Sequence, residues 1–290
     1  MSTRRTFIKQ SSLLSAAFLV NPDSLLFKQT PIGLQIYTLR DQMFKDSKGT
    51  LKQVADLGFN TIETFAYMNG KWFGMTAKEL SAYLKSIGLS SPSGHTFLAS
   101  IFLKEGWEDS WKQAVADAKE LGQEYIVIPW LEEAHRGSVE KYKKIAEGLN
   151  KAAVVAQSGG LQLAYHNHDF EFDKIGGGVT GFDILSKETD PALVKFELDL
   201  YWTVRAGHNP IELFNQHPGR ISMWHVKDMD KTEKKFFTEV GNGTIDFKGI
   251  FEHAKHSGMK YFFVEQDVCP GNPLDSIKQS IGYLRKNLVK

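Results

Sequence analysis

The chain alternates eight times between a short apolar run and a longer segment with helical periodicity. The apolar runs have the length of strands and span residues 33–37, 61–64, 89–94, 125–130, 161–166, 194–199, 221–226 and 261–265. Amphipathic segments such as 111–121, 139–157 and 247–255 lie between them. Eight βα repeats in 290 residues match the pattern and the size of a single (βα)8 barrel. We therefore predict an α/β fold of the TIM-barrel type.

Glycine recurs where a predicted helix should end and the next strand begin. The six positions are Gly58, Gly88, Gly122, Gly159, Gly219 and Gly258. Helices commonly end on a residue with positive φ, which glycine adopts without steric cost, so these glycines mark turns from helix to strand. A doubly wound open sheet would also show strands alternating with helices along the chain. However, no Gly-x-Gly-x-x-Gly motif follows the first predicted strand, which disfavours a dinucleotide-binding fold.

The first thirty residues differ in composition from the rest of the chain. Arg4 and Arg5 precede a short apolar run at 13–20, and Asn21-Pro22 follow it. Paired arginines ahead of a modest apolar stretch are typical of a twin-arginine export signal, and the stretch is too short to span a bilayer. We predict a leader at residues 1–30, a barrel at 31–290 and a periplasmic mature protein. The alternative is a cytoplasmic protein with a basic tail.

Composition narrows the kinds of partner and site. Lysine and arginine total 35 against 34 acidic residues, a formal net charge of +1, so no basic surface for nucleic acid or anionic lipid is expected. The single cysteine, Cys269, allows neither an internal disulfide nor a thiolate metal cage. Any bound metal must therefore have nitrogen and oxygen ligands. The expected partner is a small molecule, and exposed barrel helices are compatible with a homodimer.

Four polar residues stand at the ends of four successive predicted strands: His166, Asp199, His225 and Glu265. In a parallel barrel these ends meet at one rim, and strand parity points the four side chains toward the barrel axis. Two imidazoles and two carboxylates suit one divalent ion, Mn²⁺, Co²⁺, Zn²⁺ or Fe²⁺, better than Ca²⁺. The sequence therefore predicts a metal site, where an ion would ease removal of a proton next to a carbonyl.

Five short motifs at the predicted strand ends form an ordered set. They are Ile-Gly-Leu-Gln-Ile-Tyr-Thr-Leu-Arg at the first strand, Tyr-His-Asn-His-Asp-Phe-Glu-Phe at the fifth, Leu-Asp with Ala-Gly-His-Asn-Pro after the sixth, His-Val-Lys-Asp at the seventh and Val-Glu-Gln-Asp at the eighth. The set covers about residues 31–288 and resembles the xylose isomerase-like sugar (phosphate) isomerase/epimerase family. The resemblance implies one catalytic metal at the ends of strands five to eight, with Asp199, His225 and Glu265 at the positions of family ligands.

Two positions depart from the family pattern. His166 stands where the keto-sugar epimerases usually have glutamate, and Trp202 stands where they often have histidine. Two glutamates form the acid/base pair in those epimerases, so Glu265 has no second glutamate as its partner here. His166 would be either a ligand or a base with a pKa near working pH. Such a base also fits removal of a proton α to a ketone followed by loss of a β substituent.

Further residues on the predicted rim are candidates for the reaction or for substrate contact. Glu63 is a candidate acid/base, beside Glu265 and His166. Candidates for substrate contact are Tyr37, Trp72, His95, Trp130, His168, Glu171, Trp202 and Lys227. Lys227 would either neutralise an enolate or pair with Asp228. The stretch 176–178, three glycines, is predicted to be a flexible loop rather than a phosphate cradle.

The sequence leaves three functions open. The first is a sugar isomerase or epimerase that acts through a metal-stabilised enediolate. The second is a lyase that carries out β-elimination on 3-keto-glycosides at the same site, as some exported relatives in the family are understood to do. The third is a non-catalytic sugar-binding barrel. An abasic-site endonuclease shares this barrel but needs more metal ligands and a basic face, which the charge balance disfavours.

Overall fold

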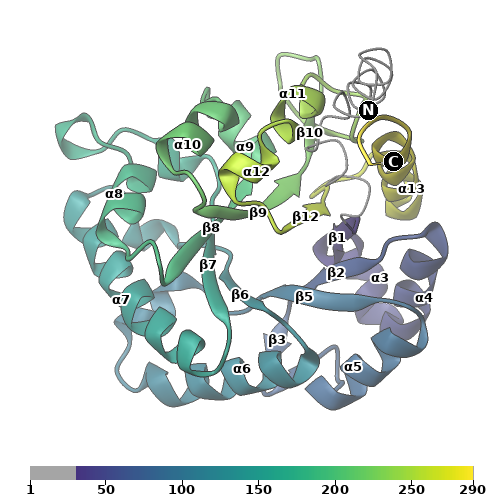
Figure 1. The fold of residues 1–290 in the computed structure, drawn as a ribbon, viewed down its shortest axis with the longest axis horizontal. Helices are drawn as coiled ribbons and strands as arrows, with labels where there is room; N and C mark the ends of the chain where they lie inside the picture. Colours follow the sequence, from purple (N-terminus) through teal and green to yellow (C-terminus); the bar gives the residue numbers. More distant parts are fainter. Residues whose placement is uncertain (1–30, 290) are drawn as a thin grey trace, which may run out of the picture.

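Eight parallel strands close into one barrel in this computed structural model, which describes residues 31–289 (Figure 1). The strands are β1 (Gly33–Gln35), β2 (Thr61–Thr64), β5 (Ser90–His95), β6 (Tyr125–Ile128), β7 (Gln162–His166), β8 (Val194–Asp199), β9 (Ile221–Val226) and β12 (Tyr261–Val264). Their order around the barrel is β1-β12-β9-β8-β7-β6-β5-β2, and β1 pairs with β2 to close it. All eight predicted strands are present, and the predicted single-domain TIM barrel is confirmed.

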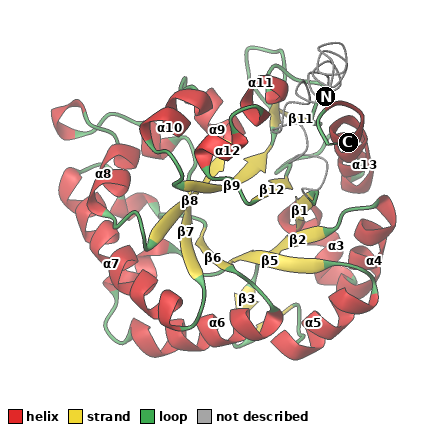
Figure 2. Ribbon diagram, in the orientation of Figure 1, coloured by secondary structure: helices red, strands yellow, loops and turns green. Residues whose placement is uncertain are grey.

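Helices surround the ring of strands (Figure 2). They are α3 (Arg40–Lys45), α4 (Ser47–Leu57), α5 (Ala77–Ser86), α6 (Trp107–Leu121), α7 (Val139–Ser158), α8 (Gly181–Glu188), α9 (Leu200–Arg205), α10 (Pro210–Gln216), α11 (Phe247–Phe251), α12 (Ala254–Ser257) and α13 (Pro273–Asn287). The predicted helical segments 111–121 and 139–157 lie within α6 and α7. The predicted segment 247–255 is interrupted, because Glu252 and His253 separate α11 from α12.

Short hairpins and turns of 3-10 helix lie in the loops between strands and helices. Two small hairpins pair β3 (Tyr67–Met68) with β4 (Lys71–Trp72) and β10 (Asp228–Met229) with β11 (Phe237–Thr238). Turns of 3-10 helix span Ile36–Leu39, Ala99–Leu103, Glu133–His135, Phe170–Phe172 and Gly176–Gly178. The glycine stretch is thus a turn closed by a bridge between Lys174 and Thr180.

The barrel interior has its own small apolar core, separate from the large core between strands and helices. The interior core consists of Tyr125, Val127, Ala164, Met223 and Phe263. Ala164, Met223 and Phe263 each lie two residues before a predicted site residue, and side chains two apart share a strand face. The apolar floor and the polar mouth of the barrel are therefore built from the same inward face.

Five of the six predicted turn glycines have a left-handed backbone. Their φ angles are 93°, 78°, 100°, 71° and 91° at Gly58, Gly88, Gly122, Gly219 and Gly258. The prediction is wrong at Gly159, whose φ is −81°. Gly160 takes the left-handed position there, with φ of 78°, because α7 runs to Ser158 and the chain reverses one residue later.

The predicted leader at residues 1–30 lies outside the described residues, so export and a periplasmic location stay predictions. Within residues 31–289, none of the helices combines the length and the apolar character needed to cross a bilayer. The homodimer likewise stays a prediction.

Candidate functional site

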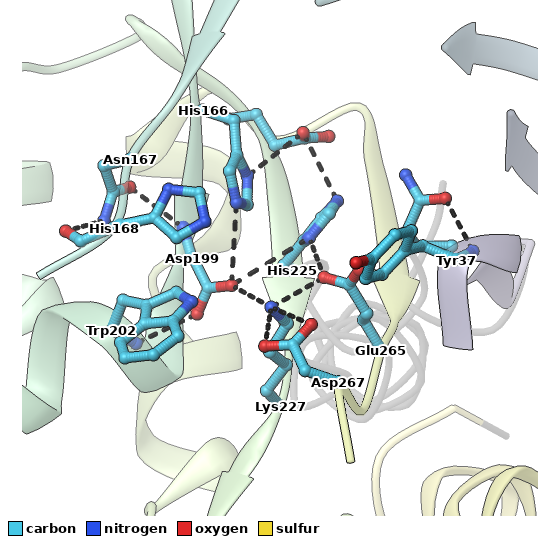
Figure 3. Close-up of polar contacts among 12 residues, drawn as sticks. Tyr37, His166, Asn167, His168, Asp199, Trp202, His225, Lys227, Glu265 and Asp267 are labelled. Carbon is cyan, nitrogen blue, oxygen red and sulfur yellow. Dashed lines mark hydrogen bonds and ion pairs between the residues drawn. The ribbon is translucent and has the colours of Figure 1, made fainter. Parts of the chain in front are cut away.

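The C-terminal ends of β7, β8, β9 and β12 are neighbours in the barrel and bring polar side chains to one mouth (Figure 3). Asp199 on β8 pairs in register with His225 on β9, and His225 pairs on its other side with Phe263, two residues before Glu265. Asp199 also caps α9, because its Oδ1 accepts the backbone N–H of Trp202 at 3.0 Å. That bond fixes the carboxylate and leaves Oδ2 facing the other site residues.

Three of the four predicted ligands form a compact group, which we call the outer triad: Asp199, His225 and Glu265. Each offers one ligand atom within 4.8 Å of the others. His225 Nδ1 lies 2.7 Å from Glu265 Oε2 and 3.9 Å from Asp199 Oδ2. The fourth predicted ligand, His166, places Nε2 at 3.8 Å from Asp199 Oδ2 and belongs instead to a second group that could hold a metal ion, with His95, Glu197 and His225. All four side chains are buried.

A second group lies deeper in the barrel, and we call it the inner cluster: Glu63, His95 and Glu197. Glu197 Oε2 lies 2.9 Å from His95 Nε2, 3.3 Å from His166 Nδ1 and 3.3 Å from His225 Nε2. Burial alone would lower the pKa of His95, but Glu63 and Glu197 raise it to about 9. The motifs do not single out Glu197. Strand parity could have found it, because it lies two residues before Asp199 on the same face.

Glu63 lies beneath the rim rather than on it, which differs from the prediction of an acid/base at the mouth. Its Oε2 is 2.6 Å from His225 Nε2 and accepts a hydrogen bond from Gln35 Nε2 at 2.7 Å. Its Oε1 accepts a hydrogen bond from Ser93 Oγ. Burial alone would raise the pKa of Glu63, but His95 and His225 hold it well below the usual value. This buried anion therefore orients His225 so that Nδ1 faces the outer triad.

Lys227 joins the site through three carboxylates. Its Nζ lies 2.9 Å from Asp199 Oδ2, 2.7 Å from Glu265 Oε2 and 3.1 Å from Asp267 Oδ2. Although burial works against the ammonium, these carboxylates raise the pKa of Lys227 well above its usual value. The alternative pairing with Asp228 is wrong. The Asp228 carboxylate accepts backbone N–H groups of the loop at 241–245 instead.

A cavity of about 540 Å³ opens over this mouth. Of the predicted site residues, those in its lining are Tyr37, His95, Trp130, His166, His168, Trp202, Lys227 and Glu265. Trp72 is not in the lining, because it is buried in the β3–β4 hairpin against Tyr67. A larger hollow of about 710 Å³ lies beside the start of α4 and contains none of the predicted site residues.

Glu171 is also outside the cavity, so its predicted substrate contact does not match its position. The carboxylate is fully buried, accepts a hydrogen bond from Tyr165 Oη at 2.6 Å and accepts the His168 backbone N–H at 2.7 Å. Burial raises the pKa of Glu171 to about 7, although both hydrogen bonds act in the opposite direction. Glu171 therefore holds the loop that carries His168, two residues beyond the end of β7.

The raised pKa of Glu171 predicts a dependence of stability on pH. The unfolded carboxyl ionises near its ordinary pKa, whereas the folded one stays protonated up to about pH 7, so stability should fall as pH rises through this interval. The shift corresponds to a loss of about 3 kcal/mol. Urea unfolding of the wild type and Glu171→Gln at pH 5 and pH 8 should show a larger fall in the wild type, because His95 contributes a fall to both proteins. An equal fall in both proteins would contradict the assignment.

The donor set at the mouth fits a divalent metal ion. His166 Nδ1 and Glu197 Oε1 are buried and make no hydrogen bond within the described residues. Buried polar atoms without partners are rare and point to a bound group. Imidazole nitrogen and carboxylate oxygen are ligands that Mn²⁺, Co²⁺, Zn²⁺ and Fe²⁺ accept. The buried group of histidine, glutamate and aspartate is therefore consistent with a divalent metal site.

Comparisons with known proteins agree with the fold. The sequence model of a family described as "Xylose isomerase-like TIM barrel" matches residues 51–287. The crystal structure of a sugar phosphate isomerase/epimerase from Parabacteroides distasonis is similar, with a TM-score of 0.78 and 27% identity over 89% of this chain and 99% of that one.

Curated relatives are also similar in sequence. An inosose dehydratase of Clostridium beijerinckii is 26% identical over 72% of this chain and 81% of the relative. An inosose dehydratase of Lacticaseibacillus casei is 30% identical, over 50% of this chain and 54% of that protein. The second match thus spans only about half of each protein.

Proposed function

Because this chain belongs to the xylose isomerase-like TIM barrel family, we propose that it is a metal-dependent carbohydrate enzyme that removes a proton next to a carbonyl group. One observation carries the proposal: the outer triad converges beneath a cavity at the C-terminal mouth of the barrel. Active sites of TIM-barrel enzymes lie at this face. The names of the relatives, inosose dehydratase and sugar phosphate isomerase/epimerase, support a substrate of the sugar class.

The outer triad is the proposed ligand set. A divalent ion held by Asp199, His225 and Glu265 would supply Lewis-acid polarisation of the substrate carbonyl. Burial alone would raise the pKa of Glu265, but Lys227 and His225 hold it well below its usual value. Glu265 is therefore a carboxylate, suited to a ligand and too weakly basic to be the main proton acceptor.

His166 is the proposed proton acceptor. Burial and the neighbouring His225 hold its pKa well below the usual value, so the imidazole is neutral. Nδ1 lies 3.3 Å from Glu197 Oε2, and the tautomer with its proton on Nδ1 would carry the lone pair on Nε2. Nε2 faces the outer triad, and His166 lines the cavity. This base stands within reach of a carbon next to the polarised carbonyl.

Elimination is the favoured outcome of this proton removal. An epimerase needs acid/base groups on both faces of the substrate, and the family pattern supplies two glutamates. Here His166 occupies one of these positions, and Glu265 is paired with Lys227 at 2.7 Å. A single neutral base fits loss of a β substituent after α-proton removal. The dehydratase names of the curated relatives support the same outcome. The candidate substrates that we propose for it are 3-keto-glycosides.

Proton exchange in D₂O tests the proposal. Metal-loaded protein is incubated with free ketoses and with 3-keto-glucosides, and the reaction is followed by proton NMR. Release of an aglycone with an unsaturated product would support elimination, whereas deuterium uptake with intact bonds would support isomerase or epimerase chemistry. Ligand binding without either change would support the non-catalytic sugar-binding barrel and refute the proposal.

Replacing Glu63 by glutamine should weaken metal binding without removing a ligand. The amide keeps the size of the side chain but loses the charge that orients His225 at 2.6 Å. Loss of such an outer partner typically lowers metal affinity by about 10–100-fold. Isothermal titration with Mn²⁺ and Zn²⁺ measures the effect, with the exposed Glu120→Gln on α6 as control. Unchanged affinity in Glu63→Gln would show that Glu63 does not orient the ligand.

A further inference from the structure

The cavity lining is polar on one side of the barrel mouth and mostly apolar on the other. The polar part comes from β7, β9 and β12 and their loops: His166, His168, Lys227, Glu265 and Asp267. The apolar part comes from the loops after β12, β1, β2, β5 and β6: Val268, Tyr37, Phe65, Leu98, Pro129 and Trp130. These five strands are consecutive around the barrel, so the apolar side chains follow one arc of the mouth, which they share with Arg40, His95 and Thr96. We call it the apolar arc.

The apolar arc is open to solvent at four large side chains. Tyr37, Leu98, Trp130 and Val268 are 39%, 46%, 37% and 46% exposed, and they come from four different loops. Scattered exposed hydrophobic residues are ordinary, but a contiguous group in a cavity marks a binding surface. A volume of about 540 Å³ also falls in the range of sites for drug-sized ligands, about 300–1,000 Å³.

Trp130 is held in place by Arg136, which is outside the cavity lining, and by His168, which is part of it. The Arg136 guanidinium carbon lies 4.6 Å from the centroid of the Trp130 ring, and the His168 ring lies edge-on at 4.5 Å. Across the mouth, Tyr37 packs edge-on against Phe65 at 5.2 Å. Both exposed aromatic rings are thus oriented before a ligand arrives, which lowers the entropy lost on binding.

The cationic side chains in the described cavity lining already have partners, and His95 is paired with Glu63 and Glu197. Among the described lining residues, Arg40 and Lys227 are the only lysine or arginine. Arg40 Nη1 donates to the Tyr37 carbonyl at 3.2 Å, and its guanidinium lies over the Tyr37 ring at 4.7 Å. Lys227 is buried and paired with the carboxylates of Asp199, Glu265 and Asp267. Phosphate sites depend on cations or backbone N–H groups that point at the anion, and Glu265 and Asp267 would repel it.

We propose that the substrate is an unphosphorylated sugar that carries an apolar or aromatic substituent, an inference that rests on the proposed function. The sugar lies on the polar part of the lining, above the outer triad. The substituent lies on the apolar arc, in contact with Trp130. This assignment separates the chain from enzymes that act on sugar phosphates.

Paired glycosides test the proposal without turnover. Affinities of the methyl and 4-nitrophenyl glycosides of glucose, galactose and mannose are measured by isothermal titration, together with glucose and glucose 6-phosphate. In at least one pair the aryl glycoside should bind at least about tenfold more tightly, because the ring buries apolar area on the arc. Glucose 6-phosphate should bind no more tightly than glucose.

Substitutions test whether the preference for aryl glycosides depends on Trp130. Trp130→Ala should bring the affinity ratio of aryl to methyl glycoside close to one, whereas Trp130→Phe should keep most of it. The control Phe236→Ala removes an exposed aromatic side chain outside the cavity lining and should leave the ratio unchanged. Equal affinities in every pair, no binding of any aryl glycoside, or a tenfold preference for the phosphate would each overturn the inference.

The two proposals fail separately. An aryl preference without deuterium exchange or elimination would refute only the proposed function. Exchange or elimination without an aryl preference would refute only the inference about the substituent.

Discussion

Replacing His225 by alanine should abolish tight binding of a divalent metal and, with it, proton exchange on the substrate. His225 joins the two groups at short distances: Nδ1 lies 2.7 Å from Glu265, and Nε2 lies 2.6 Å from Glu63. Its loss removes a ligand and takes one partner from each of two buried carboxylates, those of Glu265 and Glu63. Metal affinity should drop by more than about 100-fold, since loss of an outer partner alone costs about 10–100-fold.

Isothermal titration with Mn²⁺ and Zn²⁺ measures this loss, and metal analysis of the purified protein provides a second readout. The exposed His256 on α12 offers a matched control, because His256→Ala removes an imidazole that is in neither the cavity lining nor either group of site residues. Retention of wild-type metal affinity in His225→Ala would place the ion elsewhere and refute the outer triad as the ligand set.

Replacing Lys227 by methionine should destabilise the metal-free protein strongly, and added metal should restore much of the loss. The ammonium is within 3.1 Å of three carboxylates, those of Asp199, Glu265 and Asp267. Removing one partner of a buried ion pair typically costs about 3–5 kcal/mol. In a protein of this size that corresponds to a drop in Tm of roughly 10 °C. A divalent ion on the outer triad would return positive charge to the same carboxylates.

Thermal unfolding with and without Mn²⁺ or Zn²⁺ measures both effects. The metal-induced rise in Tm should be larger in Lys227→Met than in the wild type and in the exposed control Lys248→Met. An equal rise in all three proteins would show that the ion and Lys227 do not share these carboxylates.

The sequence alone determined the barrel and the strands that carry the site. Strand-length apolar runs report burial on both faces of a parallel strand, and helix-to-strand glycines report a backbone conformation that other residues avoid. Both are local properties, so they were readable without coordinates. Strand parity is local as well, which is why His166, Asp199, His225 and Glu265 were correctly placed at the mouth.

Loop geometry was harder to predict. Glu171 and Trp72 have the side chains of substrate-contacting residues, yet one faces Tyr165 and the other packs against Tyr67. No periodicity governs the direction of a side chain in an irregular loop. The turn at Gly160 rather than Gly159 has the same origin, because helix ends shift by a residue with little cost.

Only the tertiary structure decided which charges meet. Glu63 and His225 are 162 residues apart in the chain, but the closed barrel brings them to 2.6 Å. The same closure sets Glu197 beneath three imidazoles and Lys227 among three carboxylates. Electrostatic partners depend on distance in space and on burial, which raises the strength of each interaction. The strand ends therefore followed from local pattern, while the division into an outer triad and an inner cluster required the three-dimensional arrangement.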